Sequence, residues 1–455
     1  MASRQPYVPD PKILELGPDF YDPVEAARFP KAIPRFLNRR WAEKVGLGEV
    51  DWEAHFHRFE PLPGNLGQPL ALRYHGHQFR SYNPEIGDGR GFLFAQLRDD
   101  RGRLLDLGTK GSGQTPYSRF GDGRLTLKGG VREVLATEML EALGVDTSKT
   151  FALFETGEEL VRGDEPSPTR SSVLTRLSHG HIRIGTFQRL AFFGETENIA
   201  KLTGYCLQHL YGEPADSGPH RLFELVAAAA ARLAAAYMAA GFVHGVLNTD
   251  NIAITGESFD YGPWRFALRW DDGFTAAYFD ETGLYAFGRQ PEAIHWNLAQ
   301  LAGCLAMVAE APPLADQLRG WGARFETELA EALLARLGVP VRSGEEDRVL
   351  ASALIAALRS EEVAIDRVFF DWRGGLDPGA EPYASEPFRA LAAALEGRAN
   401  PGARGHEYWD GGQPCSMPID EVEAIWAAIA ESDDWTPFET KIAAIRRMGE
   451  AMHAA

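Results

Sequence analysis

The segment from His244 to Pro263 gathers side chains that suit chemistry on a phosphate group. Asp250 and Asn251 stand side by side, and Asp260 follows further along the same segment. Magnesium takes a few hard oxygen ligands from a protein and completes its shell with phosphate and water oxygens, so Asn251 and Asp260 are candidate Mg²⁺ ligands. A carboxylate beside such a site can orient or deprotonate a hydroxyl nucleophile, which makes Asp250 a candidate catalytic base.

The pattern between these residues predicts a short β-hairpin over Ile252–Phe259, with its turn near Gly256. A hairpin returns to where it started, so Asn251 and Asp260 would meet at one end. The alternative is an Asx-rich loop in which these side chains only cap turns. A helical stretch before the segment and Asp-Tyr-Gly after it favour the functional interpretation.

Glycine-rich turns occur three times in the first third of the chain. Gly-Asp-Gly-Arg occupies positions 87–90 and again 121–124, and Gly-Thr-Lys-Gly-Ser-Gly lies between them at 108–113. Glycine lets backbone N–H groups approach phosphate oxygens, and the neighbouring arginine and lysine supply positive charge. None of the three is a Walker A loop or a GxGxxG fingerprint, and each alone is also typical of a surface β-turn. Their clustering favours a nucleotide site.

Charged residues near these turns have spacings that suit phosphate binding. Lys110 follows a strand-like run, and Glu133 comes 23 residues later, in the first turn of a helix predicted over Val131–Leu143. In kinases a strand lysine pairs with a helix glutamate and grips the phosphates. A carboxylate in a first helical turn also has a purely local explanation, the helix dipole. Arg176 and Arg183 suit phosphate recognition, with surface salt bridges as the alternative.

These candidates fall on two compositionally different parts of the chain. Residues 61–190 are rich in glycine and short β-like runs, which predicts a small sheet-rich lobe carrying the nucleotide loops. Residues 191–455 predict a larger helical lobe with the catalytic loop, and residues 1–60 an N-terminal extension. The expected fold class is therefore α+β with two lobes. Long loops are expected over 370–415, and helices at Leu222–Ala240, Glu292–Glu310, Ala323–Leu337, Ile419–Ser432 and Glu439–Met452.

The 455-residue chain carries a net charge of −18, from 64 acidic and 46 basic residues. Such a surface repels polyanions, so broad binding to nucleic acid or to anionic membranes is not expected. The longest apolar stretch, Leu225–Val243, is mostly alanine and contains Arg232, which predicts a buried helix. The polar N-terminus shows no secretory signal, and three scattered cysteines suit a reducing compartment, so a cytoplasmic location is expected.

Taken together, the motifs resemble the selenoprotein O family, known as protein adenylyltransferase pseudokinases. The resemblance is specific because eight stretches match in order over roughly residues 70–305, whereas the chain after about residue 310 matches only loosely. They are YHGHQF (74–79), IGDGRGFL (86–93), KGSGQTPYSRFGDGR (110–124), VREVLATE (131–138), TRLSHGHIRIGTF (175–187), HGVLNTDNIAI (244–254), DYGP (260–263) and RQPEAIHWNLAQLA (289–302).

The resemblance implies a protein-kinase-like fold in which ATP binds in a flipped orientation. AMP would pass from the α-phosphate to a Ser, Thr or Tyr hydroxyl of a protein substrate, with diphosphate leaving and Mg²⁺ (or Mn²⁺) as cofactor. By position, Asp250 would be the catalytic base, and Asn251 and Asp260 would hold the metal. Arg176 and Arg183 would meet the distal phosphates. The full set of positions that would bind ATP is Gly87, Gly89, Arg90, Lys110, Asp122, Gly123, Glu133, Arg176, Arg183 and Asp260.

Two other functions stay open on the sequence. An ordinary protein kinase would transfer the γ-phosphate, but kinases place the asparagine five positions after the catalytic aspartate, whereas Asp250 and Asn251 are adjacent. A catalytically silent scaffold would bind ATP without turnover, and the presence of both residues together with Asp260 argues against it. The chain departs from the family in having no cysteine after Cys415, so redox control through a tail cysteine is not expected. The sequence leaves the protein substrate and the oligomeric state undetermined.

Overall fold

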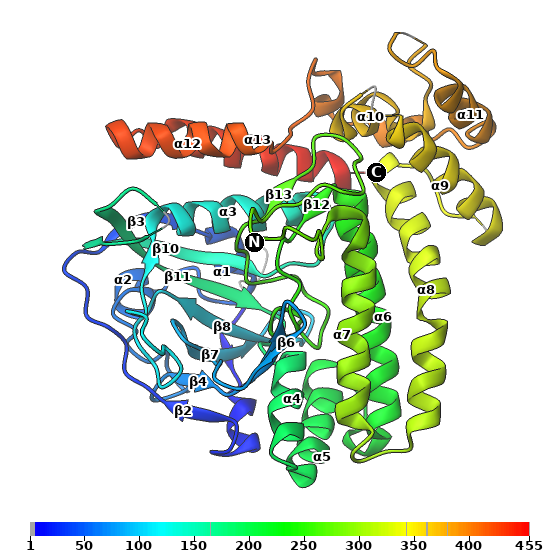
Figure 1. The fold of residues 1–455 in the computed structure, drawn as a ribbon. Coiled ribbons are helices and arrows are strands. Elements are labelled where there is room, and N and C mark those ends of the chain that lie inside the picture. The colour runs from blue at the N-terminus through cyan, green and yellow to red at the C-terminus, as the bar shows by residue number, and fades with distance from the viewer. Residues whose placement is uncertain (1–4, 164, 343, 361–362, 380, 455) are drawn as a thin grey trace.

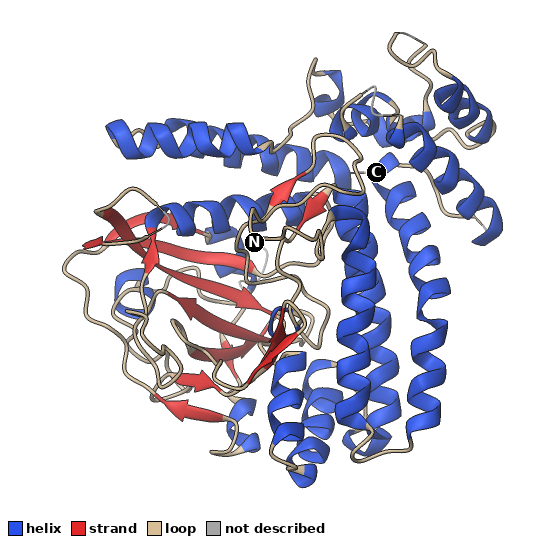
Figure 2. Cartoon of the chain, in the orientation of Figure 1, coloured by secondary structure: helices blue, strands red, loops and turns tan. Residues whose placement is uncertain are grey.

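The computed structural model describes residues 5–163, 165–342, 344–360, 363–379 and 381–454 (Figure 1). A curled antiparallel sheet with its covering helices forms one part and a set of long helices forms the other, which confirms the expected α+β class (Figure 2). The strands are β1 (Val8–Pro9), β2 (Tyr21–Pro23), β3 (Ile33–Leu37), β4 (Leu70–Leu72), β5 (Gly76–Gln78), β6 (Ser81–Asn83), β7 (Leu93–Arg98), β8 (Leu104–Lys110), β9 (Leu125–Thr126), β10 (Lys149–Leu160), β11 (Thr169–Ser178), β12 (Phe242–Val243) and β13 (Arg265–Phe266). The α-helices are α1 (Arg39–Lys44), α2 (Trp52–Phe56), α3 (Leu127–Ala142), α4 (Ile184–Phe192), α5 (Thr196–Tyr205), α6 (Gly218–Ala240), α7 (Gln290–Leu305), α8 (Ala311–Leu337), α9 (Gly344–Arg359), α10 (Ile365–Asp371), α11 (Glu386–Ala394), α12 (Ile419–Ser432) and α13 (Thr436–His453).

The large sheet runs in the order β2-β4-β7-β8-β11-β10-β3, with β1 added beside β7 and β9 beside β11. Alternate side chains of each strand point to opposite faces of the sheet, and a hydrophobic core covers each face. Leu153 and Leu174 join the core under α3, whereas Phe151 and Val173 join the core on the other face. The register of β8 on β11 pairs Lys110 with Leu174, so the lysine also points toward α3.

Residues 1–60, expected as an extension, contribute three strands to this same sheet. β1 pairs with β7, β2 with β4, and β3 with β10, all antiparallel. Phe36 and Leu37 are the end of β3, and the helix α1 begins only after them. The first 60 residues are thus structurally part of the sheet that carries the glycine loops.

Helix α3 begins four residues earlier than Val131, the start predicted from apolar spacing. The Thr126 side chain caps it by accepting the Gly129 N–H, an interaction that helix N-termini commonly use. A Cβ at Gly130 would lie 2.5 Å from Leu153 Cδ1, so glycine is what lets the helix approach the sheet this closely. Glu133 consequently lies well inside the helix and not in its first turn, which removes the local dipole explanation for it.

The second part is built around the apolar helix α6. It packs against α7 and α8, which run beside it in Figure 1. By length and composition, residues 215–240 could cross a membrane, but 72% of their most apolar window is buried inside the protein. The prediction of a buried helix is confirmed, and Gly241 ends it in the left-handed conformation (φ 68°).

The C-terminal helices α12 and α13 return to the first part and lie against α3 (Figure 1). Arg446 on α13 makes two hydrogen bonds to Glu138 on α3, at 2.7 and 3.0 Å. A Cβ at Gly449 would lie 3.2 Å from Ala142, so the two helices are in close contact. The stretch 370–415, expected as loops, also contains α11 and short 3₁₀ turns.

Candidate active site

A cleft of about 840 Å³ opens between the glycine loops of the first part and the segment 246–262. It brings together nearly all of the sequence-predicted site residues. Those that line it are Gly87, Gly89, Arg90, Lys110, Asp122, Gly123, Arg176, Asp250, Asn251 and Asp260. The remaining two, Glu133 and Arg183, lie directly behind the lining, where each contacts a lining residue.

Three cations converge on the carboxylate of Asp260 at the buried end of the cleft. Arg176 donates a hydrogen bond to it, Arg183 Nη1 lies 3.2 Å away and Lys110 Nζ 3.9 Å. Lys110 also donates to Glu133 Oε2 at 2.5 Å. Burial alone would raise the pKa of Asp260, but the charges of Arg176, Lys110 and Arg183 hold that pKa well below its usual range. Asp260 is therefore ionised, in a backbone conformation (φ 60°) that ordinarily favours glycine.

Arg176 and Arg183 bracket a loop and do not share a helix face. Arg176 is on β11, and Arg183 is the residue before α4. Both are buried, Arg183 with only 1% of its surface exposed, so the surface salt-bridge alternative does not apply. The Arg183 guanidinium lies 4.1 Å from the centre of the Tyr74 ring and donates to the backbone oxygen of Asp250 at 3.0 Å. A fixed guanidinium of this kind suits bidentate contact with phosphate.

Asp88 is a site residue that the sequence reasoning missed. Its Oδ1 lies 3.4 Å from Arg183 Nη2, and its Oδ2 accepts the Leu72 N–H at 3.0 Å. The carboxylate therefore connects the first glycine turn to the buried arginine. The sequence could have indicated Asp88, because it lies between two predicted site residues, Gly87 and Gly89, in the repeated Gly-Asp-Gly-Arg motif.

Asp250 and Asn251 belong to a 3₁₀ turn, Thr249–Asn251, that is fixed from the side of β5. The Thr249 hydroxyl oxygen accepts the His77 N–H at 2.7 Å. Burial raises the pKa of Asp250 to about 6, and its Oδ1 is buried with no hydrogen-bond partner among the described residues. Asn251 donates its side-chain amide to Val246 O at 2.9 Å, which leaves its Oδ1 available as an acceptor.

The expected hairpin over Ile252–Phe259 does not form. Its first half bridges to Arg183 through Ala253, and its second half bridges to Thr147 through Ser258, so each half pairs with another segment. The turn near Gly256 is present, with φ 73° and a hydrogen bond from its N–H to Ala253 O. Asn251 and Asp260, at the two ends of the segment, still reach the same cleft. They are positioned by contacts with distant parts of the chain, and not by pairing between the two halves of the segment.

Glu257, within this segment, is a buried carboxyl that accepts the His179 backbone N–H at 2.6 Å. Burial raises its pKa to about 7 from an ordinary value of 4.5. The folded protein thus keeps this proton up to about pH 7, whereas the unfolded chain releases it near pH 4.5. Stability should fall as pH rises between these values, by up to about 3 kcal/mol in total.

Glu257→Gln is therefore expected to flatten the stability profile and to make the protein more stable than wild type at pH 8. Denaturant unfolding at pH 5 and pH 8 measures the effect. Glu431→Gln, at an exposed position on α12, is the matched control and should keep the wild-type slope. Equal slopes for wild type and Glu257→Gln would contradict the assignment.

The two Gly-Asp-Gly-Arg turns are held together by the segment between them. Tyr117 packs on the first turn and donates its hydroxyl to Asp22 Oδ2 at 2.5 Å. The Thr115 hydroxyl donates to Asp88 O, and the Ser118 hydroxyl to Gly89 O. Here glycine is required by close approach, because a Cβ at position 87 would lie 2.5 Å from Tyr117 Cγ and one at position 89 would lie 2.9 Å from Tyr117 O.

Gly87→Ala is expected to displace the Tyr117 ring and weaken ATP binding about tenfold, in line with overpacking costs of about 1–3 kcal/mol. Gly262→Ala is the matched control, since Gly262 lines the same cleft but a Cβ at this position would meet no atom within 4 Å. Isothermal titration of both variants with ATP checks the effect. Equal affinities would show that the contact between the loops does not shape the site.

The oxygen-rich end of the cleft suits a hard divalent cation. Asn251 Oδ1 and the Asp260 carboxylate are the kind of ligands that Mg²⁺ takes. Among the described residues, no group of three His, Cys, Asp or Glu side chains could hold a metal alone. A cation here would therefore share its shell with a phosphate-bearing ligand and water.

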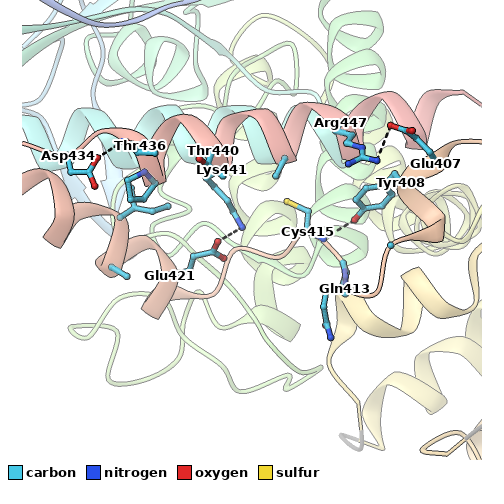
Figure 3. Close-up of a pocket in the computed structure, with 16 residues that line it drawn as sticks. Glu407, Tyr408, Gln413, Cys415, Glu421, Asp434, Thr436, Thr440, Lys441 and Arg447 are labelled. Carbon is cyan, nitrogen blue, oxygen red and sulfur yellow. Dashed lines mark hydrogen bonds and ion pairs between the residues drawn. The ribbon is translucent and has the colours of Figure 1, made fainter.

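A second cavity of similar size, about 830 Å³, lies between residues 407–415 and the helices α12 and α13 (Figure 3). Lys441 is paired with Glu421 at 2.7 Å and Arg447 with Glu407 at 2.9 Å, and Asp434 accepts the Thr436 N–H at 2.9 Å. None of the predicted site residues lines it. The chemistry therefore belongs to the first cleft.

Buried cations, an ionised carboxylate and an adjacent Asp-Asn pair around one cleft suit an enzyme that acts on a phosphate-bearing substrate. The comparisons identify the kind: the chain belongs to the SelO family, since the family model described as Protein adenylyltransferase SelO matches residues 6–383. It is 44% identical to the Protein nucleotidyltransferase YdiU of Gloeobacter violaceus, over 96% of this chain and 95% of that one. The proteins of the same name from Synechococcus elongatus and Synechocystis are 41% and 40% identical, over 99% and 94% of this chain and 98% and 96% of theirs. The similarity thus extends beyond residue 310, where the motifs match only loosely.

Proposed function

We propose that this chain is a Mg²⁺-dependent protein adenylyltransferase, which transfers AMP from ATP to Ser, Thr or Tyr hydroxyls of proteins and releases diphosphate. The observation that carries this proposal is the convergence of three buried cations on Asp260 beside a buried Asp250. Such a cluster provides fixed positive charge for a polyphosphate next to a carboxylate that can accept a proton. Family membership supports the same activity.

The strand-and-helix ion pair supports a protein-kinase-like arrangement of the cleft. Lys110 at the end of β8 meets Glu133 on α3, as a kinase strand lysine meets its helix glutamate. We propose that Lys110 contacts phosphate while Glu133 holds it in place. Gly87, Gly89 and Arg90 would then line the nucleotide from the first turn.

The depth of the arginines supports a flipped nucleotide. Arg176 lines the buried end of the cleft and Arg183 lies directly behind it, both against Asp260, so they would hold the β- and γ-phosphates there and leave the α-phosphate nearer Asp250. The acceptor oxygen would attack the α-phosphorus and give its proton to Asp250. The bond from the α-phosphorus to the bridging oxygen would break, and diphosphate would leave with both electrons.

Asn251 and Asp260 would hold Mg²⁺, which supplies charge neutralisation for the phosphates when it is bound. Asn251 is oriented for this by its bond to Val246 O, and Asp260 by its ion pairs with the arginines. Three free cysteines, Cys206, Cys304 and Cys415, support a cytoplasmic location.

Labelled ATP tests the reaction directly. The purified protein is incubated with Mg²⁺ and ATP labelled at either the α- or the γ-phosphate, and covalent label on protein is measured. Label from the α-position alone is expected. Label from the γ-position would mean an ordinary kinase, and label from neither, with casein or the protein itself as acceptor, would favour a silent ATP-binding scaffold.

A further inference from the structure

Phe120 is a large apolar side chain left entirely in solvent. It lies in the turn Ser118–Gly121, closed by a hydrogen bond from the Gly121 N–H to Ser118 O at 2.7 Å, and its exposure is 107% of the reference value. It also lines the nucleotide cleft. The turn itself is fixed, because the Ser118 hydroxyl donates to Gly89 O. A ring presented by a fixed turn, with nothing packed on it, has both faces free for a ligand.

The other aromatic side chains described along the cleft are already engaged. Tyr74 lies under the Arg183 guanidinium, and Tyr117 packs on the first glycine turn. Tyr261 donates its hydroxyl to Ser258 Oγ at 2.7 Å and is 5% exposed. Within the described lining, Phe120 is thus the aromatic ring available for stacking.

The charges of the cleft indicate which end of a nucleotide reaches this ring. At the mouth, Asp122 is paired with Arg162 at 2.8 Å and Glu158 with Arg124 at 2.8 Å, so these four groups neutralise one another. The pKa of Asp122 is lowered, since the hydrogen bond from Arg162 and other favourable contacts together outweigh its partial burial, and it stays anionic. The mouth therefore offers a phosphate no excess of charge, whereas Lys110, Arg176 and Arg183 gather at the buried end, so the phosphates belong at that end and the uncharged part of the ligand at the mouth.

The Asp122–Arg162 pair also joins the Phe120 turn to the end of the β10–β11 hairpin. Val161, next to Arg162, is 80% exposed and lines the same cleft. An aromatic ring and an aliphatic side chain, both exposed at one mouth, can enclose a flat ligand between them. Arg119 adds a guanidinium whose plane can also stack on a base.

We propose that Phe120 and Val161 form the nucleobase subsite, with Phe120 stacking on the face of the base. This inference rests on the proposed function, because it takes the bound nucleotide as given. It assigns the exposed ring a role in nucleotide affinity that is separate from the phosphate contacts at the buried end. Base stacking on an aromatic side chain tolerates different bases, so the subsite supplies affinity more than base discrimination.

Phe120→Ala is expected to raise the Kd for MgATP by roughly 5- to 100-fold and to leave the Kd for inorganic tripolyphosphate unchanged. Isothermal titration measures both ligands, without any acceptor protein. Phe120→Trp should restore ATP binding. Since the ring contacts solvent only, the thermal midpoint of Phe120→Ala should match wild type, which excludes loss of folding as the cause.

Phe193→Ala is the matched control, because Phe193 is likewise an exposed phenylalanine (55%) but lies at the end of α4, outside the cleft lining. It should bind ATP like wild type. Equal loss of ATP and tripolyphosphate affinity in Phe120→Ala, or no loss of either, would overturn the proposal. If wild type bound ATP through Phe120 but transferred the γ-phosphate, the proposed function would fail while the base subsite would stand.

Discussion

Asp260→Asn is expected to reduce AMP transfer roughly 100- to 1,000-fold and to destabilise the protein by about 3 kcal/mol. The amide keeps the shape of the side chain but removes the negative charge on which Lys110, Arg176 and Arg183 converge. Lys110 would keep Glu133 at 2.5 Å, but Arg176 and Arg183 would lose their closest carboxylate and retain only Glu133 at 3.8 Å and Asp88 at 3.4 Å. Transfer from α-labelled ATP measures the first effect and denaturant unfolding without metal measures the second.

Glu423→Gln is the control for this variant, since Glu423 pairs with Lys128 on the surface at 2.7 Å and is 46% exposed. An exposed pair of this kind contributes under about 1 kcal/mol. Asp260→Asn with wild-type stability would mean that the arginines do not depend on the carboxylate for their placement. Wild-type transfer activity would remove Asp260 from the proposed site.

Asp250→Asn is expected to lower AMP transfer by roughly 10²–10⁴-fold, the usual contribution of a general base. ATP affinity should stay near wild type, because the proposed role of Asp250 is toward the acceptor hydroxyl and its side chain contributes no positive charge to the phosphates. The fold should be at least as stable as wild type, since an amide in this buried position carries no charge to desolvate. Steady-state transfer rates, ATP titration and unfolding are measured on the same preparation.

Asp260→Asn and Asp250→Asn therefore distinguish a carboxylate that holds the cations in place from one that accepts a proton. Asp271→Asn, an exposed aspartate that accepts the Gly273 N–H at 2.8 Å, serves as control for the asparagine substitution and should transfer AMP normally. If Asp250→Asn kept full activity, another group would have to accept the proton of the hydroxyl. If it lost ATP binding in proportion to activity, Asp250 would have a role in binding and not in catalysis.

Helices with one clear apolar face can be predicted closely from the sequence. Ile419–Ser432 is α12 as predicted, because its apolar residues recur at helical spacing and it is exposed on the other side. The apolar spacing places the start of α3 too late, since Gly129 and Gly130 resemble helix breakers. Position 130 needs glycine because the helix closely approaches Leu153 on the sheet. This tertiary contact cannot be read from the local sequence.

The segment Ile252–Phe259 shows why local pattern fails at the site itself. Alternating apolar residues indicate only that both faces are buried, and they do not say which partner covers each face. The partners, Arg183 and Thr147, are distant in sequence. The same holds for Asp88, whose contact with Arg183 joins residues 95 positions apart. The motifs predict which residues gather around the cleft, but not the network of contacts that positions them.

The contact between α13 and α3 has a consequence for how the protein matures during synthesis. The ribosome releases α3 early, whereas α13 emerges only after the whole helical part has been made. Until then α3, which carries Glu133, lacks the Arg446–Glu138 hydrogen bonds and the close packing at Gly449. A nascent chain can thus build its sheet and glycine loops before α13 packs on α3, so we expect the helix that carries Glu133 to be held less firmly until synthesis is complete.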